Sequence, residues 1–132
     1  MSEKDDAALA ARLERLGELA DADLLRRGRH LSADIMLGVG AVPVYLAIAA
    51  GRVVSVETGP RLMRSWRFAI RGSARAWAEY WRPVPAPGWH DLFALGKRGE
   101  MAIEGDLQPF VANLQYMKDL LALPRRLAGA SA

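Results

Sequence analysis

Cysteine is absent from this 132-residue sequence, and histidine occurs only twice. Without cysteine the chain has no disulfide framework, zinc ribbon, iron–sulfur cluster or cysteine nucleophile. The two histidines, His30 and His90, are far apart and belong to no His-x-x-x-His, His-x-His or Asp-x-Asp pattern. We therefore expect no metal site and no cofactor.

Signatures of nucleotide binding and serine hydrolysis are also missing. Gly38 and Gly40 have no third glycine behind them and precede an alternating pattern, which is typical of a hairpin turn and not of a dinucleotide-binding loop. No serine stands in a Gly-x-Ser-x-Gly setting, and Ser73 is better explained as a helix N-cap.

Acidic and basic residues are unevenly distributed. Residues 1–25 contain seven acidic and three basic residues, a net charge of −4, and the remainder carries +7. A basic body attracts nucleic acid, anionic membranes or acidic ligands. No nucleic-acid-reading motif accompanies the basic residues, so we expect no specific nucleic-acid partner and leave a transient contact with an anionic membrane open.

Length and composition predict one compact α+β domain with its own core, since 52% of the residues are hydrophobic and 25% are charged. The acidic start lacks the basic and apolar regions of a secretory signal, so we expect a cytoplasmic protein. Residues 35–51 carry no charge, but Gly38, Gly40, Pro43 and Gly51 interrupt them. This stretch therefore predicts a hairpin and not a membrane span.

Periodicity in the first half predicts a helix over residues 4–29, followed by antiparallel strands. Strands are expected over residues 35–39, 42–49 and 52–57, with tight turns at Gly40-Ala41 and Ala50-Gly51. A fourth strand alternates Trp66, Phe68 and Ile70 with Arg67, Ala69 and Arg71, which predicts that the first three side chains point inward.

The second half predicts a helix from the Ser73 cap to about Trp81, then a proline-rich loop and a short helix over residues 89–95. A last strand over residues 101–104 is followed by one closing helix, capped by Asp106 and ended by Pro124. The expected architecture is a five-stranded, mostly antiparallel sheet covered on one face by helices. We divide the chain into an N-terminal helical extension, residues 1–31, and a domain of residues 32–132.

Only one local constellation suggests acid/base chemistry, namely His90 and Asp91 beside Trp89. A histidine near a carboxylate can titrate near neutrality. Adjacent helical residues do not face each other, however, and polar residues at a helix start commonly satisfy free amides, so a structural role is the simpler interpretation.

Aromatic residues cluster between the fourth strand and the last helix. Such a cluster either fills a core or lines a cavity, and composition alone favours the core.

The stretch 32–123 resembles the sterol-carrier-protein type-two domain family. The matching pieces are residues 68–73 leading into the helix with Trp77, residues 91–95, and residues 101–106 leading into the closing helix. The resemblance implies an apolar tunnel between sheet and helices that accepts fatty acyl chains, sterols or similar lipids. The high tryptophan content would narrow such a tunnel and favour a ring-containing ligand.

We therefore expect binding or transfer of a hydrophobic small molecule. The candidate lining residues are those aimed inward by the predicted alternation and helical stripes: Trp66, Phe68, Ile70, Trp77, Trp81, Phe93, Phe110, Leu114 and Met117. Arg64 or Arg71 at the rim would pair with an acidic head group.

Two alternatives stay open. One is a small enzyme or accessory subunit acting on an apolar substrate in the same pocket, with His90 and Asp91 as acid/base groups. The other is an interaction module, in which the acidic N-terminal helix docks on a partner or forms a homodimer.

Overall fold

The described residues form a mixed, five-stranded sheet with strand order β3-β2-β1-β4-β5. The computed structural model describes residues 3–60, 64–85, 87–89, 95–96 and 99–125. The strands are listed here in chain order: β1 (Ala33–Val39), β2 (Val42–Ala49), β3 (Arg52–Thr58), β4 (Phe68–Gly72) and β5 (Met101–Gly105). Neighbouring strands are antiparallel except β1 and β4, which run parallel. The predicted mostly antiparallel, five-stranded sheet is confirmed.

The first three strands form two successive hairpins because the predicted turns supply the required backbone conformations. Gly40 has φ +59°, and Ala50 and Gly51 have φ +50° and +82°, as tight two-residue hairpin turns demand. The register places Ile35 opposite Leu46 and so fixes one apolar face. The uncharged stretch 35–51 is thus a hairpin, as predicted, and none of the helices in the described ranges is long and apolar enough to cross a bilayer.

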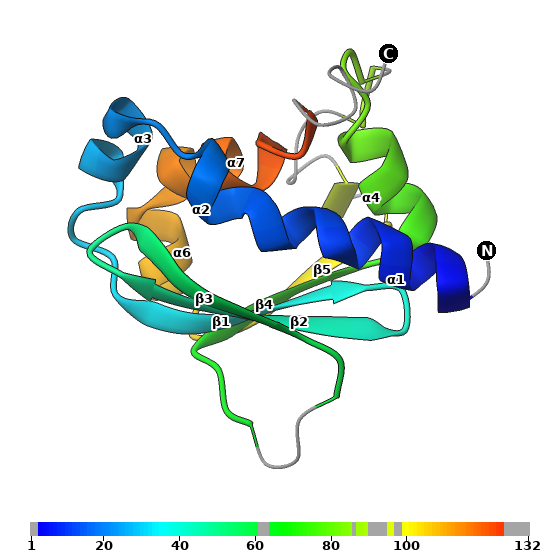
Figure 1. The fold of residues 1–132 in the computed structure, drawn as a ribbon, viewed down its shortest axis with the longest axis horizontal. Coiled ribbons are helices and arrows are strands. Elements are labelled where there is room, and N and C mark those ends of the chain that lie inside the picture. Colours follow the sequence, from blue (N-terminus) through cyan, green and yellow to red (C-terminus); the bar gives the residue numbers. More distant parts are fainter. Residues whose placement is uncertain (1–2, 61–63, 86, 90–94, 97–98, 126–132) are drawn as a thin grey trace.

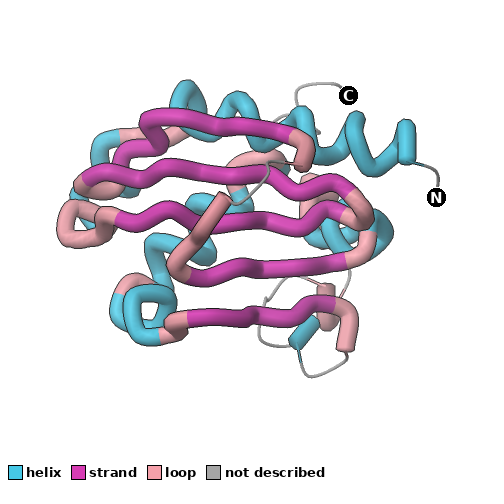
Figure 2. The backbone as a smooth tube through the Cα atoms, turned by 90° about the horizontal axis from the view of Figure 1, so that it is seen from below, coloured by secondary structure: helices cyan, strands magenta, loops and turns pink. Residues whose placement is uncertain are grey.

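The helices lie on one side of the sheet, and the described parts of the connection from β3 to β4, residues 59–60 and 64–67, lie on the other side (Figure 1). Because β4 pairs with β1, the chain must pass β2 and β1 between the end of β3 and the start of β4. Figure 2 shows this connection from the side of the sheet that the helices leave uncovered. We call these two sides the helix-covered face and the uncovered face.

The N-terminal helical segment is broken, although one helix over residues 4–29 was expected. It consists of α1 (Glu3–Ala11), η1 (Arg12–Arg15), α2 (Leu16–Leu19) and α3 (Ala22–Arg27). Ala20 is extended, with φ −69° and ψ 129°, and the Asp21 carboxylate accepts a hydrogen bond from the Leu24 amide at 2.9 Å. Asp21 therefore starts a new helix as an N-cap instead of continuing the old one.

Further helices follow β4 and β5. The predicted Ser73 cap begins α4 (Ala74–Tyr80), and its hydroxyl accepts the Ala76 amide at 3.0 Å. The predicted single closing helix is divided into α6 (Gln108–Ala112) and α7 (Leu114–Ala122). The predicted short helix over residues 89–95 falls largely outside the described residues.

The division of the closing helix has a local cause. Asn113 has φ −121° and ψ 34°, outside the helical region, and its side-chain amide donates to the Pro109 carbonyl at 3.0 Å. An asparagine that hydrogen-bonds nearby backbone competes with regular helix formation.

One apolar core lies between the sheet and the helices. Leu13 and Leu16 from the N-terminal segment, Leu37 from the sheet and Met117 from α7 are fully buried members of the same cluster. Residues 1–31 thus contribute to the core of the sheet domain, and their division from residues 32–132 stays a prediction.

Candidate functional site

Most of the predicted lining residues come together in the layer between the sheet and the helices. Phe68 and Ile70 are buried on β4, Phe110 on α6 and Met117 on α7, and all four belong to one core. The rings of Phe68 and Phe110 meet edge to face with their centroids 5.7 Å apart. This arrangement joins the sheet directly to the helix that follows β5.

Trp77 on α4 and Trp81, the residue that caps the end of this helix, form a second aromatic pair in this layer, with ring centroids 5.0 Å apart. Both indoles are buried, and both have a hydrogen-bond acceptor. Trp77 Nε1 donates to the Gly38 carbonyl at 2.8 Å, and Trp81 Nε1 donates to the Leu121 carbonyl at 2.7 Å. These bonds fix each ring and leave its carbon surface facing the apolar layer.

Buried polar groups in this layer are satisfied. No buried side-chain nitrogen or oxygen among the described residues is without a hydrogen-bond partner. Tyr116 donates its hydroxyl to the Gly51 carbonyl at 2.6 Å, and burial raises the pKa of Tyr116 to about 12. The interior is thus chemically suited to apolar groups and offers few free polar partners.

Leu114 and Trp66 are less buried than the other predicted lining residues. Leu114 is half-buried and packs against the core. Trp66 precedes β4, and the guanidinium carbon of Arg71 lies 6.0 Å from the centroid of its ring. Trp66 is half-buried and is not a member of the core cluster. Its predicted place in the lining stays a prediction. Phe93 lies outside the described residues.

The two predicted rim arginines lie on the uncovered face and not beside the apolar layer. Arg64 forms an ion pair with Glu57, and its guanidinium carbon lies 5.5 Å from the centroid of the Tyr45 ring. Arg71 forms an ion pair with Glu104 across β4 and β5. Each arginine thus pairs with a carboxylate of this chain, on the side of the sheet away from the helices.

The candidate acid/base pair, His90 and Asp91, lies outside the described residues. Within the described ranges, no group of three or more His, Asp or Glu side chains is placed to hold a metal ion.

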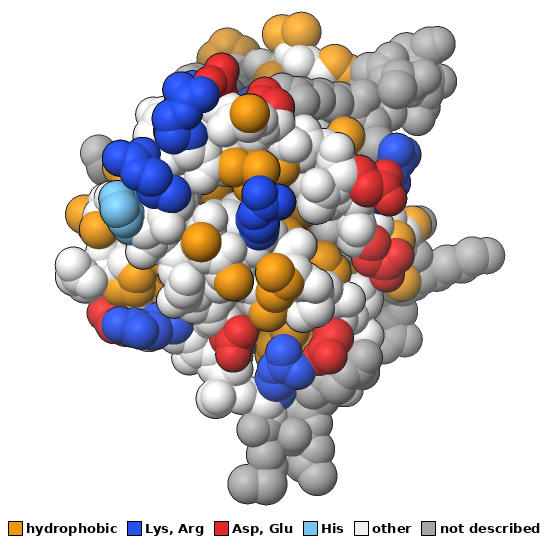
Figure 3. Space-filling view, turned by 60° about the vertical axis from the view of Figure 1, so that its left-hand side comes forward, with side chains coloured by type: hydrophobic (Ala, Val, Ile, Leu, Met, Phe, Trp, Pro, Cys, Tyr) orange, Lys and Arg blue, Asp and Glu red, His pale blue; other side chains and the backbone are white. Residues whose placement is uncertain are grey.

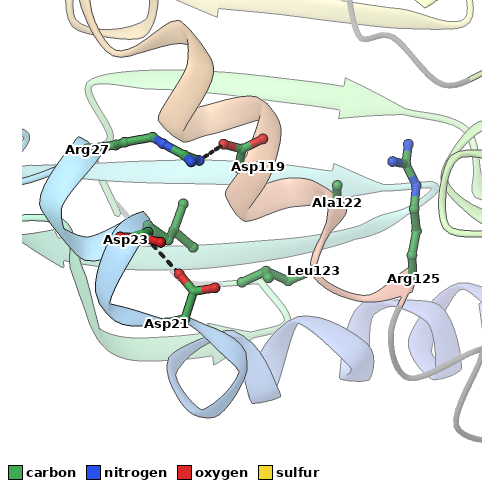
Figure 4. Close-up of a pocket in the computed structure, with 8 residues that line it drawn as sticks. Asp21, Asp23, Arg27, Asp119, Ala122, Leu123 and Arg125 are labelled. Atoms are coloured by element: carbon green, nitrogen blue, oxygen red, sulfur yellow. Dashed lines mark hydrogen bonds and ion pairs between the residues drawn. The ribbon is translucent and has the colours of Figure 1, made fainter.

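A polar cleft of about 420 Å³ lies between α3 and the end of α7 (Figure 4). Leu24 and Leu123 line it together with charged side chains from both helices. Arg27 pairs with Asp119 across the cleft, and Arg125 stands on the side away from Arg27. Arg125 donates to the Tyr80 carbonyl at 2.7 Å and lies over the Tyr80 ring.

A second pocket, of about 510 Å³, lies where the turn after α3 meets α6. We call it the basic pocket, and the following residues line it: Arg27, Arg29, His30, Leu31, Ser32, Arg67, Gln108, Pro109, Ala112 and Asn113. The sequence showed the short run Arg26-Arg27-Gly28-Arg29, but nothing in it placed this run beside Arg67 and α6.

Sequence comparisons give no match: no protein-family model matches the chain, and no curated protein matches it.

Solved structures with the same fold do exist. A crystal structure of sterol carrier protein 2 has a TM-score of 0.64 and 15% identity, covering 94% of this chain and 95% of that one. UbiJ-SCP2, a ubiquinone synthesis protein, has a TM-score of 0.55 and 18% identity, covering 96% and 97%. The sterol carrier protein domain 2 of Helicoverpa armigera has a TM-score of 0.56 and 13% identity, covering 92% and 93%. The expected resemblance is thereby confirmed at the level of the fold.

Proposed function

We propose, from its sterol-carrier fold, that this chain binds or transfers a hydrophobic small molecule, such as a fatty acyl chain, a sterol or a similar lipid. The ligand would lie in an apolar space between the sheet and the helices. The observation that carries the proposal is an interior rich in aromatic side chains, within a fold shared with sterol carrier protein 2.

The proposed ligand contacts are the described, inward-facing residues among those predicted. They are Phe68, Ile70, Trp77, Trp81, Phe110, Leu114 and Met117. Burial of apolar surface yields about 25 cal/mol per Å², so a ligand that buries roughly 300 Å² gains several kcal/mol before the entropic cost of association.

The rings of this layer contact one another, so a ligand has to displace side chains or a helix. The junction between α6 and α7 is the most suitable place for such movement. The helix breaks there at Asn113, and α7 begins without a side-chain cap. Hinge movements in proteins commonly use a few residues at the ends of helices, which absorb the change in backbone dihedral angles.

A ring-containing ligand fits this proposal better than a straight alkyl chain. Trp77 and Trp81 present flat indole surfaces in the apolar layer. One structural neighbour, UbiJ-SCP2, is a ubiquinone synthesis protein. A prenylated aromatic ring is therefore a reasonable ligand to include beside fatty acids and sterols.

Native mass spectrometry of the protein purified from cells tests the proposal, with added palmitate, cholesterol and a prenylated quinone as probes. We expect a stoichiometric complex with at least one of them. Absence of any complex, together with no rise in melting temperature on addition of the probes, would contradict ligand binding.

A matched pair of tryptophan substitutions on α7 tests where the ligand binds. Leu114→Trp adds an indole next to the apolar layer, whereas Gln115→Trp adds it on the exposed side of the same helix. We expect at least a tenfold loss of affinity for the bound probe in Leu114→Trp and less than a twofold change in Gln115→Trp. Equal affinity in both folded variants would place the ligand elsewhere.

The proposal includes no cofactor, a cytoplasmic location and a transient contact with anionic membranes. A homodimer through the N-terminal helices would use their outer side, because Leu9, Leu13 and Leu16 are buried within the chain. The mass of the native protein and its co-sedimentation with phosphatidylglycerol vesicles test these two contacts.

A further inference from the structure

We propose that the basic pocket binds the anionic head group of an amphipathic ligand, a carboxylate or a phosphate, while the apolar part of that ligand enters the layer between the sheet and α6. This inference rests on the proposed function and names the class of ligand. The pocket contains three arginines and one histidine, and no acidic residue is among its lining residues.

The basic pocket directly adjoins the apolar layer. Two of its lining residues, Arg67 and Pro109, are the chain neighbours of Phe68 and Phe110, whose rings form the edge-to-face pair. Leu31, another lining residue, is itself buried in the core. A molecule with its head in the pocket therefore has its tail at the contact between the sheet and α6.

The arginines of the pocket are held in position without losing their ability to bind an anion. Arg27 pairs with Asp119, and Arg67 Nε lies 3.1 Å from an Asp106 carboxylate oxygen. Arg29 donates to the Arg26 carbonyl at 2.7 Å, which fixes its side chain without neutralising its charge. A guanidinium has five N–H donors, so each side chain keeps free donors for a carboxylate or phosphate.

The backbone around Arg67 is also fixed. Its amide donates to the Asp34 carbonyl at 2.7 Å, and its carbonyl accepts the Asp106 amide at 2.9 Å. These bonds hold the residue between β1 and β5 at one end of the sheet. Figure 3 shows this end of the molecule, where basic side chains and a histidine lie side by side. Arginines fixed in this way lose little conformational entropy when an anion binds.

The cleft between α3 and α7 does not offer the same chemistry. Asp21, Asp23 and Asp119 line it, and these carboxylates repel an anion. Arg27 lines both the cleft and the basic pocket, but Arg29 and Arg67 line only the basic pocket. The head group is therefore assigned to the basic pocket.

Titration calorimetry with palmitate, hexadecyl phosphate, hexadecanol and inorganic phosphate tests the inference. We expect at least one of the two anionic amphiphiles to bind at least tenfold more tightly than the alcohol of the same chain length, and inorganic phosphate to bind much more weakly than either. In Arg29→Ala, the affinity for the anionic amphiphile should fall at least fivefold and that for hexadecanol should stay within twofold. Arg82→Ala removes an exposed arginine outside the pocket and should change neither of these two affinities.

Equal binding of acid and alcohol, or an equal loss of both in Arg29→Ala, would overturn the head-group site and leave hydrophobic binding intact. Inorganic phosphate binding as tightly as the amphiphiles would indicate a free-anion site and overturn the link to the apolar layer. Binding of none of the four probes would overturn this inference, whereas the proposed function is decided separately by native mass spectrometry with cholesterol and a prenylated quinone.

Discussion

Tyr116 joins three elements of the molecule at one point. Its hydroxyl reaches the Gly51 carbonyl of the β2–β3 turn, and its ring packs against the backbone at Gly28, just after α3. A Cβ atom at Gly28 would lie 2.3 Å from ring carbons of Tyr116, so only glycine fits there without rearrangement. The glycine in the Arg26-Arg27-Gly28-Arg29 run therefore has a packing role in positioning the basic pocket.

Replacement of Tyr116 by phenylalanine tests this contact. The change leaves a buried carbonyl of Gly51 without its partner, and we expect a loss of about 1–2 kcal/mol in the free energy of unfolding by urea. Tyr45→Phe is the control, because Tyr45 is partly exposed on the uncovered face. The free energy of unfolding of Tyr45→Phe should stay within about 0.5 kcal/mol of that of the parent protein.

The same tyrosine predicts a dependence of stability on alkaline pH. The pKa of Tyr116 is raised from 10.0 to about 12, so the folded protein retains a proton that the unfolded chain loses first. The contribution of protonated Tyr116 to the free energy of unfolding is fully present below pH 10 and is lost as the pH rises towards 12. The stability of Tyr116→Phe should therefore fall less steeply over this range, and parallel curves would contradict the assignment.

At the scale of elements, the N-terminal segment contributes buried side chains to the core. Leu13 and Leu16 are fully buried, and the buried Asp6 accepts the Ala41 amide of the β1–β2 turn at 3.0 Å. The contact also explains Gly40, where a Cβ would lie 2.3 Å from the Asp6 carboxylate.

Truncation of one leucine in this segment measures its contribution. Leu13→Ala removes a fully buried side chain and should destabilise the fold by about 2–5 kcal/mol. Glu18→Ala removes an exposed residue that pairs with Arg15 and should change the free energy of unfolding by less than about 0.5 kcal/mol. A small effect of Leu13→Ala in chemical denaturation would show that the segment is separable from the sheet domain.

Elements whose signals are local were predictable from the sequence. Alternation, together with glycine at the Gly40 and Gly51 turns, was sufficient for the hairpins, and Ser73 marked the start of α4. The breaks at Ala20 and Asn113 escaped prediction, because each depends on a side chain that hydrogen-bonds nearby backbone within an otherwise helical pattern. Trp66 lies two residues before β4 begins, so strand alternation alone does not determine the direction of its side chain.

The candidate site was only partly predictable for a similar reason. Phe68, Ile70, Trp77 and Phe110 could be assigned to the interior from the periodicity of their own elements. The basic pocket joins the turn after α3, the residue before β4 and the helix after β5. Only the tertiary fold brings these three segments together, and no spacing in the sequence indicates it.

At the scale of the whole molecule, the apolar layer and the basic pocket lie next to each other. Helices cover one face of the sheet and enclose the aromatic residues, whereas Arg64 and Arg71 are paired on the other face. In the proposed mode of binding, the polar end of the ligand lies at this end of the molecule, next to α6.

Methyl NMR with isotope-labelled protein tests most directly whether a ligand enters the layer between the sheet and the helices. Addition of palmitate, or of whichever probe binds in native mass spectrometry, is predicted to shift the methyl signals of Ile70, Leu114 and Met117 and to give nuclear Overhauser effects between them and the ligand chain. Shifts confined to exposed methyl groups, such as those of Val54 and Val84, would contradict an interior binding site.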